Sequence, residues 1–64
     1  MNRIPRNFKS ITATVLTGNA RGRRMIITKD GYGYHGLDDK GTSWALFVSQ
    51  LRNDNFFKIE NIEK

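Results

Sequence analysis

Apolar and polar residues alternate along the first regular segment of the chain. In residues 8–17, Ile11, Ala13 and Val15 occupy every second position, with threonines between them. A period of two combined with many β-branched residues is typical of a half-buried β-strand. Residues 18–22, which contain two glycines and an asparagine, favour a turn after this strand.

A β-hairpin is predicted next. Residues 23–29 have the composition of a second strand, and Asp30-Gly31 that of a type I′ turn, which needs positive φ at both central residues. Residues 32–37 then return as a third strand. A two-residue turn at Asp30-Gly31 would pair Ile27 with Tyr34 across the hairpin.

The pattern changes after the polar residues 38–41. Thr42 is suited to cap a helix, because the next apolar residues follow the i, i+3, i+4, i+7 spacing of a helix face. These residues are Trp44, Phe47, Val48 and Leu51. A strand over the same segment would turn Phe47 and Leu51 outwards, so the spacing favours a helix. Residues 56–62 predict a final strand.

The predicted order β-β-β-α-β indicates an α+β fold, a small antiparallel sheet with one helix packed on a face. An all-β SH3-like or OB-like small barrel is the alternative if residues 44–51 form a strand. Residues 1–7 are interpreted as a flexible basic arm and residues 8–64 as a single domain. The expected core consists of Ile11, Ala13, Val15, either Met25 and Ile27 or Ile26, Trp44, Phe47, Val48, Leu51, Phe57 and Ile59.

The charge is strongly polarised along the chain. The net charge is +5, and residues 1–29 hold seven of the eleven cations and none of the six acids. Such clustering favours an anionic partner, either nucleic acid or an acidic protein surface. The absence of cysteine, of a signal peptide and of a long apolar stretch predicts a cytoplasmic protein with no membrane contact.

Catalysis is not expected from this sequence. General acid–base chemistry needs titratable groups positioned as a pair, and no carboxylate is spaced in this way beside the single histidine, His35. No metal or other cofactor is predicted.

The segment with the clearest binding chemistry is residues 18–24, which joins the first two strands. Two glycines and three arginines, Arg21, Arg23 and Arg24, lie within these seven residues, and arginine forks match phosphate oxygens. All three lie in a turn or at a strand end, so their replacement is expected to leave folding intact. Further candidate contacts come from the basic arm and its continuation, at Arg3, Arg6 and Lys9.

A second candidate lies in the predicted hairpin. Gly31-Tyr32-Gly33-Tyr34 resembles the Gly-aromatic-Gly-aromatic core of the RNA-binding motif of RRM and cold-shock domains. The resemblance covers about six residues, departs from the motif at Asp30, His35 and Gly36, and does not assign the chain to either family. It implies that Tyr32 and Tyr34 share a strand face, stack on bases and lie near Lys29. If Tyr34 instead lies on the core face with Met25 and Ile27, the tyrosines pack within the protein and do not contact a ligand.

These features predict a small, basic, non-enzymatic protein that binds DNA or RNA mainly through phosphate-directed arginines. The alternative is a protein-interaction module or inhibitor, like the accessory proteins of phages and mobile elements, that docks on a larger host protein. A third hypothesis is a homodimer formed by edge pairing of the uncharged, β-branched residues 10–17.

Overall fold

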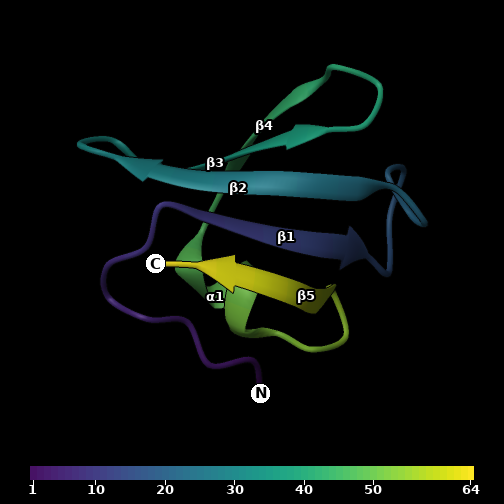
Figure 1. The fold of residues 1–64 in the computed structure, drawn as a ribbon. Helices are drawn as coiled ribbons and strands as arrows, with labels where there is room; N and C mark the ends of the chain where they lie inside the picture. Colours follow the sequence, from purple (N-terminus) through teal and green to yellow (C-terminus); the bar gives the residue numbers. More distant parts are fainter.

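In a computed structural model that describes all residues from 1 to 64, the chain forms one antiparallel five-stranded sheet and one short helix (Figure 1). The elements are β1 (Ser10–Val15), β2 (Arg24–Asp30), β3 (Gly33–Asp38), β4 (Ser43–Leu46), α1 (Val48–Arg52) and β5 (Phe57–Glu63). The strand order across the sheet is β4-β3-β2-β1-β5. The first four strands therefore form a meander, and β5 returns to lie beside β1.

The α+β prediction is confirmed only in outline, because the helix is much shorter than its apolar spacing indicated. Residues 43–46 form β4, in which Trp44 and Leu46 are half-buried while Ser43 and Ala45 are exposed. The helix begins only at Val48 and buries Leu51. The extra strand is the feature expected of the small-barrel alternative, although β4 and β5 remain the two edges of the sheet.

The β2–β3 hairpin is shifted by two residues from the predicted register. Asp30 pairs with Gly33 and Ile27 with Gly36, so the turn residues are Gly31 and Tyr32. The Asp30 carboxylate accepts a hydrogen bond from the Tyr32 N–H (2.7 Å), and Gly33 takes the positive φ of 129°. This local bond stabilises the later turn. Because the shift is an even number, the inward face of each strand is unchanged.

The core lies between the inner face of the sheet, the β1–β2 loop and α1. Met25 and Ile27 point inward and Ile26 outward, which resolves the choice left open by the sequence. Phe47 was wrongly predicted to be in the core, since it lies between β4 and α1 and is 74% exposed. Ala20, in the β1–β2 loop, was not predicted to be buried. The buried apolar residues are Ile11, Ala13, Val15, Ala20, Met25, Ile27, Leu51 and Phe57.

The prediction that residues 10–17 form an exposed edge for pairing with a second copy is wrong for a topological reason. β1 pairs with β2 on one side and with β5 on the other, so its backbone hydrogen-bonding groups face strands of the same chain. Of the two true edges, β5 carries charged residues and a bulge opposite Thr12 and Ala13. Charges and bulges are common protections against edge-to-edge association.

The N-terminal residues lie against the body of the protein. The side-chain amide of Asn2 donates hydrogen bonds to the carbonyl oxygens of Leu51 (3.0 Å) and Phe57 (2.8 Å). The backbone N–H of Asn2 donates to the carbonyl of Arg52 (2.8 Å), and Ile4 packs on the core. These contacts connect the arm with both α1 and β5.

Replacing Gly36 with alanine is expected to destabilise the protein by about 1–3 kcal/mol, as overpacking of a core does. A methyl group at this position would meet the buried Met25 side chain at Sδ and at Cγ (2.8 Å), and Leu46 Cδ1 at 3.2 Å. Gly31→Ala is the matched control, because Gly31 has open space around it and no positive φ. Chemical denaturation of both variants measures the difference. Equal stability of the two would contradict the packing described for β3.

Candidate nucleic-acid interface

The arginine-rich loop between β1 and β2 is folded back onto the sheet. The Gly22 N–H donates to the carbonyl of Val15 (2.8 Å), and Gly18 and Gly22 take positive φ values of 82° and 85°. These turns place Ala20 in the core. Arg21, the next residue, is exposed and has no carboxylate partner.

Arg23 faces a buried carboxylate, that of Asp38 at the end of β3. Its Nη1 lies 3.0 Å from Asp38 Oδ2, which also accepts a hydrogen bond from the indole Nε1 of Trp44 (2.9 Å). The other oxygen, Oδ1, accepts from the backbone N–H groups of Lys40 and Thr42, both at 2.9 Å. All four donors stabilise the ionised carboxylate.

The pKa of Asp38 is held well below its usual range, first by the indole N–H of Trp44 and then by the two backbone N–H groups and the Arg23 guanidinium. Asp38 therefore remains an anion and Arg23 its counter-ion. The structure thus places Arg23 in a buried polar cluster, unlike its neighbours Arg21 and Arg24. Replacing all three arginines would disturb this cluster.

Arg24 lies on the outer face of the sheet. It is exposed and pairs with Thr14 of β1, which pairs in turn with Lys58 of β5. Arg24 and Lys58 thus lie on either side of Thr14 in one row across the sheet. Lys58 Nζ is 3.8 Å from the Glu60 carboxylate. The Arg24 guanidinium has no ion pair, and only its backbone N–H contacts an acid, Asp39 (3.4 Å).

Lys29 and Tyr34 lie at the other end of β2, against the basic arm. Lys29 Nζ is 5.6 Å from the centroid of the Tyr34 ring and donates to the carbonyl of Arg6 (3.3 Å). The Phe8 ring stacks on Tyr34 with centroids 6.1 Å apart and planes 15° apart. Tyr34 therefore packs between the arm and the sheet.

The two tyrosines do not form one stacking platform. Tyr32 is in the turn and is 96% exposed, whereas Tyr34 is half-buried on the core side beneath Phe8. The RNA-binding motif that the segment resembles would need both rings on one accessible face. Tyr32 alone is free to contact a ligand.

The predicted site residues form two groups rather than one. Arg21 and Arg24 lie at the start of β2, and Lys29 and Tyr32 at its end. The two ends of β2 are on opposite sides of the sheet in Figure 1. A seven-residue strand spans roughly 20 Å at about 3.3 Å per residue. Arg3, Arg6 and Lys9 are exposed along the arm, and Arg6 and Lys9 are nearest to the second group.

The carboxylates are mostly engaged within the protein, and the cations mostly are not. Asp30 contacts His35 (3.2 Å), and Asp54 contacts the Met1 amino group (2.7 Å). The pKa of Asp30 is lowered mainly by the Tyr32 N–H, and that of Asp54 by the Met1 amine. Of the eleven lysines and arginines, only Arg23 and Lys58 lie within 4.0 Å of a carboxylate. The other nine form no ion pair.

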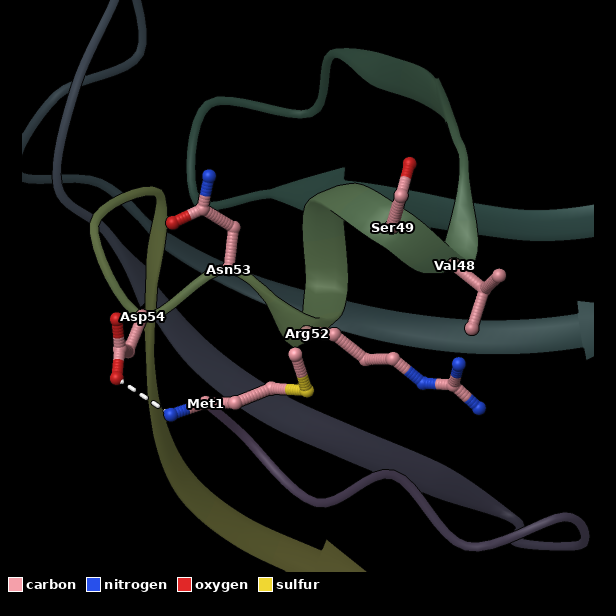
Figure 2. A pocket seen from close by; sticks show the side chains of 6 residues that line it. All are labelled: Met1, Val48, Ser49, Arg52, Asn53 and Asp54. Carbon is pink, nitrogen blue, oxygen red and sulfur yellow. Dashed lines mark hydrogen bonds and ion pairs between the residues drawn. The ribbon is translucent and has the colours of Figure 1, made fainter.

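Two depressions mark the surface around α1. The larger, about 450 Å³, lies on the solvent side of the helix and is shown in Figure 2. It contains the ion pair between Met1 and Asp54, and the Arg52 side chain extends away from this pair (Figure 2). Its polar side chains therefore do not converge on one point. The smaller cavity, about 180 Å³, lies between the arginine-rich loop and α1.

The smaller cavity includes residues that the sequence did not point to. Asn19, Gln50 and Phe56 come from the β1–β2 loop, α1 and the segment before β5, so no local pattern connects them. Trp44, assigned from the sequence to a helical core stripe, also contributes to its wall. Only the tertiary structure brings these four side chains together.

Comparison of the chain with protein-family models, curated proteins and solved structures finds no match. The one helix, five residues long, is too short to cross a bilayer, and no other helix is present. No three histidine or acidic side chains lie together as possible metal ligands, and Asp30 and Asp38 lie at opposite ends of the β2–β3 pair.

Proposed function

We propose that this protein binds the phosphate backbone of nucleic acid. One observation carries the proposal: nine of eleven cationic side chains form no ion pair, while most carboxylates are held by partners within the protein. Unpaired surface cations gain free energy by replacing the counterions of a polyanion. Arg21 and Arg24 are central, because both are exposed and they are only three residues apart, in the loop and at the start of β2.

Fluorescence anisotropy with labelled oligonucleotides at several salt concentrations tests this function. We expect dissociation constants of roughly 1–100 μM that rise steeply with salt, as for backbone-directed binding. The double variant Arg21→Gln, Arg24→Gln should weaken binding to all sequences. Its log–log salt slope should fall by about 0.9 per lost contact on duplex and about 0.7 on single strands.

The matched control is Arg52→Gln with Lys64→Gln, which removes the same charge from α1 and the C-terminal residue. Arg23 is left unchanged in both variants because it balances the buried Asp38. We expect the control to retain most of the affinity. An absence of binding at low salt by the unmodified protein would contradict the proposed function.

A protein partner is the second candidate function, favoured by one feature of the outer sheet face. Ile26 of β2 and Leu37 of β3 pair across the hairpin and are 43% and 51% exposed. Neighbouring exposed aliphatic residues are suited to a protein contact. A pull-down with and without nuclease distinguishes the two functions, because a stoichiometric protein partner that survives nuclease treatment favours this second function.

A further inference from the structure

The small cavity between the arginine-rich loop and α1 combines an aromatic wall with polar groups, and the loop beside it carries the exposed Arg21. Its volume of about 180 Å³ is below the 300–1,000 Å³ typical of sites for drug-sized ligands. One ring system can enter it, but a base pair cannot. The lining residues with a direct part in the argument are Asn19, Trp44, Gln50 and Phe56.

One ring of the aromatic wall is held in place before any ligand arrives. The indole of Trp44 is fixed by its hydrogen bond to Asp38 (2.9 Å), so its ring does not need to be ordered on binding. Phe56 is 39% exposed and is therefore accessible to a ligand. Aromatic rings are suited to stacking on bases, because every base has a π-face.

Two side-chain amides give the cavity hydrogen-bonding capacity. Asn19 is exposed, and its side-chain amide makes no hydrogen bond within the protein. Gln50 Oε1 accepts from the Phe47 N–H (2.8 Å), which leaves the Nε2 donor of Gln50 without a protein partner. Amide groups of this kind pair with the donor and acceptor edges of bases.

The loop that forms one side of the cavity also carries a cation. Gly18 and Asn19 line the cavity, and the exposed Arg21, which forms no ion pair, follows two residues after Asn19. A phosphate attached to a nucleotide whose base lies in the cavity can thus reach a cation from the same loop. The positive charge of Arg21 favours a nucleic acid over an uncharged ligand.

We infer that this cavity binds one unstacked base of single-stranded nucleic acid, with Arg21 contacting an adjacent phosphate. The inference builds on the proposed function and makes it specific: single strands bind in a mode unavailable to duplex. Asn19 and Gln50 contact the edge of the base, and Trp44 and Phe56 its face.

Trp44 is the only tryptophan of the chain, so its fluorescence reports directly on the cavity. The experiment titrates the full chain with unlabelled single strands of about ten nucleotides, as DNA and RNA, and with a duplex of the same sequence. Single strands should quench Trp44 fluorescence saturably, with the dissociation constant found by anisotropy. The duplex should bind at low salt without quenching.

The variant Asn19→Leu removes the amide while nearly keeping the side-chain volume. We expect it to weaken single-strand binding about tenfold and to leave duplex binding unchanged. Phe56→Ala should weaken single-strand binding roughly 5- to 100-fold, as the loss of a stacking partner does. Asn55→Leu is the matched control, since Asn55 is exposed outside the cavity, and it should retain full affinity.

The outcomes separate this inference from the proposed function. If neither single strands nor duplex bind, the proposed function fails and the inference with it. If both bind without quenching, and Asn19→Leu has no effect, backbone binding stands and the base site is overturned. Loss of a nuclease-resistant protein partner in Asn19→Leu, with oligonucleotide binding intact, also overturns it, because the cavity then holds a protein side chain.

Discussion

Asp38→Asn is expected to lower the melting temperature by roughly 15 °C, the effect of losing a buried charged acceptor in a domain of this size. The carboxylate accepts hydrogen bonds from Arg23, Lys40, Thr42 and Trp44 and is almost fully buried. An amide can accept at only one of its two positions, so at least one pair of donors would face an N–H₂ group. Arg23 would also lose its counter-ion.

The same variant should change how stability depends on pH. Because the folded-state pKa of Asp38 lies below that of the unfolded chain, its stabilisation is complete above about pH 5 and is lost as the pH falls below about 4. The melting temperature of the unmodified protein should therefore drop in acid. In Asp38→Asn this drop should be shallower, with a remainder from Asp30 and Asp54, whose pKa values are also lowered.

Asp39→Asn is the control for both measurements. Asp39 is the neighbouring residue, is exposed and accepts one long hydrogen bond, from the Arg24 N–H (3.4 Å). Its replacement should shift the melting temperature by only a few degrees at most. Equal effects of the two substitutions would show that the Asp38 cluster does not hold the β3–β4 hairpin together.

Leu51→Ala is expected to destabilise the protein by about 2–5 kcal/mol, the range for truncating a fully buried leucine. Leu51 is 0% exposed and is the only residue of α1 in the core. A domain of this size has little stability in reserve, so the variant should be partly or wholly unfolded at 37 °C. Thermal denaturation followed by circular dichroism measures the loss.

Phe47→Ala is the matched comparison, and it tests the corrected assignment of residues 42–51. If these residues formed one helix, Phe47 and Leu51 would lie on the same buried face and both truncations would be severe. With Phe47 74% exposed between β4 and α1, its truncation should change the stability by no more than about 0.5 kcal/mol. A severe effect at Phe47 would favour the single helix.

The binding residues were only partly predictable, because sequence shows which side chains are suited to a ligand but not which are already engaged. Arg21, Arg23 and Arg24 are chemically alike and adjacent, yet Arg23 is bound to a carboxylate fifteen residues away. Tyr32 and Tyr34 alternate as strand residues do, yet the turn exposes one and Phe8 covers the other. For Arg23 and for Tyr34, a partner distant in sequence decides the outcome.

The sequence by itself determined the elements whose signals are local. Alternation in residues 10–15 and 57–59 specified strands and their inward faces, and glycines specified the turn before β2, because strand period and backbone freedom depend on neighbouring residues. The charge bias is likewise a property of the chain alone.

Only the tertiary structure decided the secondary structure of residues 42–51, in which a strand precedes a short helix. Their apolar spacing suits a helix, but the buried Asp38 binds the Thr42 N–H and the Trp44 indole and so draws this segment into a hairpin with β3. Gly36 opposite Trp44 leaves the space that Met25 fills. These hydrogen bonds to a buried carboxylate, together with packing on the core, outweigh a helix preference of only tenths of a kcal/mol per residue, roughly the scale of propensity differences. That same hairpin places Trp44 in the wall of the cavity beside Asn19.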